Sequence, residues 1–290
     1  MRIGLIDVDG HNYPNLALMK LSAFYKANGH TVDLVTPDRA NEYDAGFASK
    51  VFSFTPMPEL PKHIEVGGSG ADVAKKLPEE IEYICPDYGL YGLDYSLGFL
   101  TRGCIRACPW CIVPEKEGGI TAHADIAEFA RHRDVVLMDN NVLASEHGLR
   151  QIEKIAALNL RVDFNQGLDT RLLDDGAARL LAKVTWLKPI RLACDSRAMM
   201  PHVQRAVERL RWHNATPRRY SVYVLVKEIP DAIERVRFLK TLNVEPFAQP
   251  YRDFRTGGKP TREQWDFAYW VNNKPLYNSV AWEDYVKHKG

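Results

Sequence analysis

Three of the five cysteines of this chain lie within eight residues, as Cys104, Cys108 and Cys111 in the segment RGCIRACPWC, and no fourth cysteine follows in this segment to complete a four-ligand set. Cysteine thiolates hold iron–sulfur clusters, four of them for a four-iron cluster. Three thiolates on one loop would leave one iron open to an outside molecule. An open iron is a place where chemistry can occur.

Zinc and a disulfide are the alternatives for these cysteines. Structural zinc takes four protein ligands, usually as two separated pairs with closely spaced histidines, whereas His123 and His132 are too far apart in the sequence for such a pair. Clustered cysteines in a cytosolic protein indicate a metal or catalytic site more than a disulfide. The ligand count therefore favours iron.

The cysteine spacing, with an aromatic residue before the last cysteine, resembles the signature of the radical S-adenosylmethionine superfamily. This resemblance implies that the three cysteines hold a 4Fe-4S cluster whose open iron is chelated by the amino and carboxylate groups of S-adenosylmethionine. It further implies a low-potential electron donor of the flavodoxin or ferredoxin type, and reductive cleavage to a 5′-deoxyadenosyl radical that takes hydrogen from a substrate. Trp110 is expected to contact the adenine; the alternative is a loop anchor packed under the cluster.

Composition points to an ordinary globular protein. The chain has 290 residues, 46% of them hydrophobic, and 38 basic against 37 acidic side chains give a net charge of +1. No global field would attract nucleic acid or a membrane, so nucleic-acid binding would need a local basic patch. No apolar run approaches the ~18 residues of a membrane span, and from the first residues we expect no leader peptide. We expect a soluble, cytoplasmic protein without a membrane partner.

Alternating apolar and amphipathic segments predict an α/β protein in four parts: a small Rossmann-like α/β unit over 1–76, a linker over 77–95, a partial (βα)6 barrel over 96–251 and a C-terminal extension over 252–290. The predicted barrel strands are GFLT, VVLMD, RVDFN, IRLAC, YSVYVLV and VEPFAQ. The superfamily is built on such a barrel, with the cysteine loop after the first strand, as here. The tryptophans and tyrosines of the extension are expected to pack in the core.

In barrels of parallel strands the functional groups lie at the carboxyl ends of the strands. The predicted cofactor-binding residues at these ends are Asp139, Asn140, Asn141, Gln166, Arg171 and Asp195. By resemblance, the turn that begins at Asp139 would bind the methionyl amino group, although the glycines typical of the family are absent there. Arg171 would pair with the ligand carboxylate, and Asp195 would bind the ribose hydroxyls.

Simpler roles are open for several of these residues. Asp139 or Asn140 would suit the cap of the following helix, and Arg171 would suit a salt bridge with a nearby acid, Asp169 or Asp174. Cys194 precedes Asp195 and is expected to be a small buried side chain.

The N-terminal unit resembles a shortened cobalamin-binding domain, through Asp9 and His11 after the first strand and a later pair of glycines. Cobalamin is the weaker expectation, because Pro14 stands where that loop has glycine and the segment is short for the complete fold. Two rival functions therefore stay open. One is cobalamin-dependent or methylthio-type radical methyl transfer to RNA, a peptide or a small molecule; the other is a non-catalytic, metal-stabilised nucleic-acid-binding module.

Overall fold

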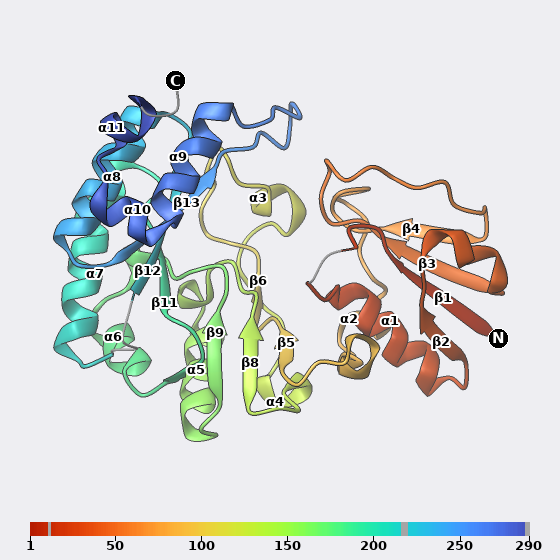
Figure 1. The fold of residues 1–290 in the computed structure, drawn as a ribbon. Helices are drawn as coiled ribbons and strands as arrows, with labels where there is room; N and C mark the ends of the chain where they lie inside the picture. The colour runs from red at the N-terminus through yellow and green to blue at the C-terminus, as the bar shows by residue number, and fades with distance from the viewer. Residues whose placement is uncertain (11–12, 216–219, 288–290) are drawn as a thin grey trace. The chain divides into compact units, whose positions relative to one another are not determined.

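The computed structural model describes residues 1–10, 13–215 and 220–287. The chain divides into two compact units, Met1–Val136 and Leu137–Gly290, each with parallel sheets and helices, so the fold is α/β (Figure 1). Among the described residues no helix is long and apolar enough to cross a membrane. His11, the candidate cobalt ligand, lies outside the described residues.

The first unit begins with a four-stranded parallel sheet in the order β2-β1-β3-β4. Its strands are β1 (Arg2–Asp7), β2 (Thr31–Leu34), β3 (Ala45–Ser49) and β4 (Ile64–Gly67). Helix α1 (Leu16–Ala27) begins at Asn15, whose side chain accepts the Leu18 N–H at 3.3 Å. Because α1 and the sheet both present apolar side chains, they form one core that includes Ile3, Leu5 and Leu18.

The segment predicted as a linker packs into this first unit. It contains α2 (Glu79–Glu82) and a 3₁₀ turn, η2 (Tyr88–Tyr91). Ile81 belongs to the same core as α1, and the Tyr91 hydroxyl donates to Asp7 at 2.8 Å. The chain therefore enters the cysteine region from a segment that packs against the core of the first unit.

The remainder of the first unit carries the cysteine loop. Its elements are β5 (Ser96–Gly98), β6 (Thr101–Arg102), α3 (Val113–Lys116), β7 (Thr121–Ala122), α4 (Ile126–Phe129) and β8 (Asp134–Leu137), after which the chain enters the second unit. The segment GFLT, predicted as one strand, forms parts of β5 and β6. Strand β6 pairs antiparallel with β7, so the cysteine loop is the connection of a hairpin.

The second unit alternates strands and helices. Its principal elements are α5 (Glu146–Ala157), β9 (Arg161–Phe164), α6 (Asp175–Leu181), β10 (Thr185–Trp186), β11 (Ile190–Ala193), α7 (Met200–Trp212), β12 (Tyr220–Val226), α8 (Ile229–Thr241) and β13 (Glu245–Pro250). Short 3₁₀ turns are η3 (Val142–Ala144), η4 (Thr170–Leu172) and η5 (Arg197–Met199), and η1 (Pro37–Glu42) lies in the first unit. A helix lies between each pair of successive predicted strands from RVDFN to VEPFAQ.

Strands β11, β12 and β13 form a parallel sheet. Alternate residues of β12, from Tyr220 to Val226, are buried, as expected for a strand with one face on a core. Helix α8 packs against β12 and β13, and the C-terminal helix α9 (Arg262–Asn272) against β13 (Figure 1).

The C-terminal aromatic residues divide between core and surface. Helices α10 (Lys274–Ser279) and α11 (Trp282–Lys287) follow α9. Trp270 and Trp282 are buried with ring centroids 5.7 Å apart, whereas Trp265 and Tyr269 are 54% and 59% exposed. The expectation of core packing therefore holds for only part of this segment.

Candidate functional site

The cysteine loop connects β6 to β7 within the first unit. Cys104, Cys108 and Cys111 are half-buried, and the Cys111 N–H donates to the Cys108 carbonyl at 3.0 Å, which closes a tight turn around Pro109 and Trp110. Trp110 is half-buried on this turn. Its contact with adenine stays a prediction.

Backbone N–H groups point at the sulfurs of Cys104 and Cys111. The Arg106 N–H donates to Cys104 Sγ at 3.3 Å, and the Val113 N–H, at the start of α3, donates to Cys111 Sγ at 3.4 Å. Donors of this kind stabilise negative charge on sulfur and tune iron–sulfur clusters. Both sulfurs are therefore hydrogen-bond acceptors in this loop, as thiolate ligands would be.

The base of the loop is closed by backbone geometry. The Cys104 N–H donates to the Gly118 carbonyl at 3.2 Å. Gly103 has φ +77°, and a Cβ at this position would lie 2.1 Å from the Gly119 carbonyl oxygen. Glycine is therefore needed directly before the first cysteine, both for its backbone conformation and for the close approach of the two ends.

The donor set can be compared with the implied cluster. Three thiols on one closed loop, with N–H donors to sulfur, suit an iron–sulfur cluster by their chemistry. In the described part of the chain, however, no three His, Cys, Asp or Glu side chains are grouped closely enough to hold a metal ion. The loop fits the cluster in residue type and hydrogen bonding, while its side chains do not form a ready metal site.

The second unit gathers polar residues after β8 and β9. Asp139 and Asn141 are buried, Asn140 is half-buried, and the Asn141 amide donates to Asp169 at 3.3 Å. Helix α5 is capped by Ser145, whose hydroxyl accepts the Gly148 N–H. The capping alternative for Asp139 and Asn140 is therefore wrong for this helix.

Arg171 makes the salt bridge that the sequence left as an alternative. Its guanidinium donates twice to the Asp169 carboxylate, at 2.7 and 3.1 Å, while Asp174 instead caps α6 by accepting the Ala177 N–H. The Asp169 side chain is only 6% exposed and that of Arg171 is 31% exposed. Gln166 is exposed in the turn after β9. Asp169 is thus the centre of this polar group, because both Asn141 and Arg171 donate to its carboxylate.

Asp195 follows β11 and is half-buried. Its Oδ1 accepts the Leu225 N–H from β12 at 3.2 Å. Burial raises the pKa of this carboxyl, and the nearby guanidiniums of Arg235 and Arg171 oppose that rise. The charge of Arg171 is the weaker of these two opposing effects on Asp195. Ribose binding by Asp195 stays a prediction.

Cys194, beside Asp195, is fully buried, as expected for a small structural side chain. Burial raises the pKa of its thiol to about 12. A thiol in this state is protonated at neutral pH, so Cys194 is neither a ready metal ligand nor a nucleophile as it stands.

Sequence reasoning missed Arg235 on α8, which is 1% exposed. Its guanidinium donates to the carbonyls of Cys194 and Leu225, at 2.7 and 2.8 Å, and to Asp231 at 2.8 Å. Arg235 therefore fixes the ends of β11 and β12 around Asp195. The signal in the sequence was Asp231 four residues before Arg235. Exposed ion pairs on helices have the same spacing, so this signal did not distinguish a buried arginine.

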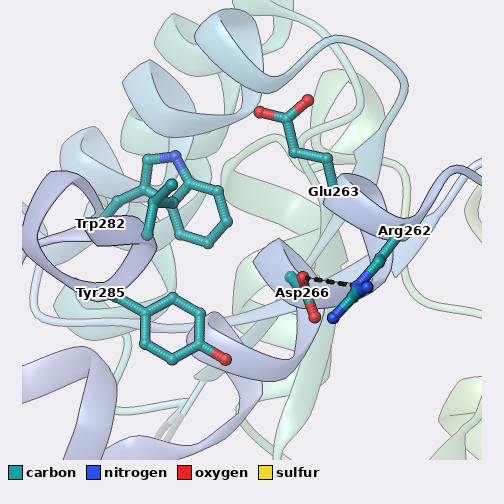
Figure 2. Close-up of a pocket in the computed structure, with 6 residues that line it drawn as sticks. Arg262, Glu263, Asp266, Trp282 and Tyr285 are labelled. Carbon is teal, nitrogen blue, oxygen red and sulfur yellow. Dashed lines mark ion pairs between the residues drawn. The ribbon is translucent and has the colours of Figure 1, made fainter. Parts of the chain in front are cut away.

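A pocket of about 220 Å³ lies between α9 and α11. Figure 2 shows the rings of Trp282 and Tyr285 on one side of it and the charged side chains of Arg262, Glu263 and Asp266 on the other. Arg262 Nε is 3.9 Å from Asp266 Oδ2. The pocket contains none of the predicted site residues and is smaller than the roughly 300 Å³ at which ligand pockets usually begin.

Comparison with known proteins adds no assignment: no protein-family model matches the chain, and no curated protein matches its sequence.

Proposed function

We propose that this chain is a radical S-adenosylmethionine enzyme in which Cys104, Cys108 and Cys111 hold a 4Fe-4S cluster. The observation that carries the proposal is the closed loop with three half-buried cysteines, two of which accept backbone N–H groups at sulfur. A bound cluster would supply one-electron chemistry: with a low-potential donor, S-adenosylmethionine is cleaved to methionine and a 5′-deoxyadenosyl radical, which abstracts hydrogen from the substrate.

The protein contributes electrostatics and exclusion of water. The N–H groups of Arg106 and Val113 lower the cost of negative charge on Cys104 and Cys111, because a hydrogen bond to a charged acceptor is stronger than one to a neutral acceptor. Half-burial of the three cysteines limits access of water and oxygen to the sulfurs.

The polar groups of the second unit suit the parts of S-adenosylmethionine. Carboxylate and amide oxygens of Asp139, Asn140 and Asn141 would accept ammonium hydrogens, and Arg171 would attract a carboxylate. Asp195, held by the Leu225 N–H, would accept hydroxyl hydrogens. In support, Asn141, Asp169 and Arg171 form one bonded group, and the charge of Arg171 acts on Asp195.

We also propose a barrel fold for the second part of the chain, an electron donor and a cytoplasmic location. The succession of parallel strands and helices favours a partial (βα)6 barrel, with functional groups at the carboxyl ends of the strands. A flavodoxin or ferredoxin would supply the electron, in the reducing cytoplasm where free thiols persist.

The test is anaerobic reconstitution with iron and sulfide, followed by detection of 5′-deoxyadenosine after addition of S-adenosylmethionine and dithionite. Wild-type protein should form 5′-deoxyadenosine without substrate, and Cys108→Ala should abolish it. Cys85→Ala is the matched control, because this half-buried thiol lies outside the loop. Equal cleavage by wild type and Cys108→Ala, or purified protein that contains zinc instead of iron, would refute the assignment.

A further inference from the structure

Glu117 follows α3 at the end of the cysteine loop, and its side chain is only 6% exposed. One carboxylate oxygen, Oε2, accepts the N–H of Gly103 at 2.8 Å. The other, Oε1, lies 3.3 Å from the Arg102 guanidinium. A single buried carboxylate therefore joins the chain after α3 to the two residues directly before Cys104.

The surroundings of Glu117 explain how a buried carboxylate is tolerated there. Arg102 lies with its guanidinium carbon 4.0 Å from the centroid of the Phe99 ring, which limits its orientation. The Lys116 ammonium also interacts with Glu117, although burial lowers the pKa of Lys116. Two cations and one backbone N–H thus compensate the desolvation of one carboxylate.

A second acidic side chain, Glu82 of α2, supports the opposite strand of the hairpin. Its Oε1 lies 3.4 Å from Lys20 Nζ of α1 and 3.4 Å from His123 Nε2, directly after β7. Lys20 also donates to the Glu82 carbonyl. The hairpin that carries the cysteines is therefore held to α1 and α2 independently of Glu117, so loss of Glu117 should open the loop without detaching its base.

We propose that Glu117 is a positioning residue that holds the two ends of the cysteine loop together before any metal is bound. The proposal rests on the proposed function, which makes the three cysteines cluster ligands. Closure by Glu117 would fix the backbone around Cys104 in advance, so that less conformational entropy is lost when ligands assemble. Without Glu117, the hydrogen bond from the Cys104 N–H to the Gly118 carbonyl would remain. It would not replace the contacts of the Glu117 carboxylate with Gly103 and Arg102.

The first experiment uses metal-free, reduced wild-type protein and measures the alkylation rate of each cysteine with iodoacetamide by peptide mass spectrometry. In Glu117→Ala, Cys104 and Cys111 should react about tenfold faster. The reason is that the loop loses a hydrogen bond to a charged group, and therefore opens more often to the reagent. Cys85 and Cys194 should keep their wild-type rates. Glu117→Gln, which retains an acceptor for the Gly103 N–H, should give a smaller increase and serves if Glu117→Ala does not fold.

The matched control is Glu115→Gln, which removes an exposed carboxylate from α3, two residues before Glu117, and should react as wild type does. Wild-type rates at Cys104 and Cys111 in both Glu117 variants would overturn the proposal. Equal acceleration of all five cysteines would also overturn it, since that result indicates general destabilisation instead of loop opening.

The second experiment measures iron loss from reconstituted protein to a chelator, together with the electron paramagnetic resonance spectrum of the reduced cluster. Glu117→Ala should lose iron about tenfold faster, with an altered spectrum, while Glu115→Gln matches wild type. Unchanged iron loss would count against Glu117. Wild-type protein that takes up no iron would refute the proposed function, while the alkylation comparison would still decide whether Glu117 closes the loop.

Discussion

Protonation of His123 should destabilise the folded protein at mildly acidic pH. Its side chain is 7% exposed. Burial, assisted by the Lys20 ammonium and opposed by Glu82, lowers the pKa of the imidazole from 6.5 to about 4. At neutral pH the ring is therefore uncharged, and its contact with Glu82 is a polar contact without a full ion pair.

The magnitude follows from the difference between the folded and unfolded pKa. Because the folded pKa is depressed, the stabilisation is fully present above pH 6.5 and is lost as pH falls toward 4, when the unfolded chain binds a proton that the folded chain excludes. The loss is about 2 kcal/mol between pH 7 and pH 5, and about 3 kcal/mol by pH 4. Total stabilities are only about 5–15 kcal/mol, so this loss is readily measured.

Urea unfolding of the metal-free protein, followed by circular dichroism at pH 7 and pH 5, tests this reasoning. His123→Gln removes the titrating group, so wild type should lose about 2 kcal/mol more than the variant over this interval. Histidine NMR should also show one ring signal, absent in the variant, that does not titrate above pH 5. Parallel loss of stability in the two proteins, or titration of His123 near its ordinary pKa, would refute the argument.

Two further substitutions test the loop and the support of Asp195. Arg235→Leu should lower the unfolding free energy by about 3 kcal/mol, because two buried carbonyls lose their donor, whereas Arg237→Leu, on the same helix and 61% exposed, should cost about 0.5 kcal/mol in urea titrations. Gly103→Ala should cost about 2–4 kcal/mol, since strain at positive φ adds to a clash with a backbone oxygen. Gly118→Ala has a similar φ but open space around its Cβ and should cost about 1–2 kcal/mol; equal losses in the two glycine variants would contradict the close approach at Gly103.

Periodicity in the sequence predicted most of the regular elements. Alternation in YSVYVLV predicted β12, because burial of one face imposes a period of two on a strand. The separation of GFLT into two strands was not predictable in this way. A short apolar run does not specify which neighbouring strand its backbone will pair with.

The candidate site was predictable only in part. Cysteine spacing is local, so it located the loop, and strand ends located the polar residues of the second unit. Their partners were not predictable. For Arg171 the sequence allowed both a ligand role and a salt bridge with Asp169 or Asp174, and only the fold showed that it pairs with Asp169. The sequence did not distinguish Arg235 from a surface residue; the packing of α8 on β12 buries it.

The sequence by itself determined the residue chemistry of this protein: three closely spaced thiols, a near-neutral charge and the order of strands and helices. Only the tertiary structure decided which charges are buried and what they contact, as with Glu117 against Gly103 and Glu82 against Lys20. The physical reason is that spacing within a segment is fixed by covalent geometry, whereas burial and pairing depend on which distant segments desolvate one another.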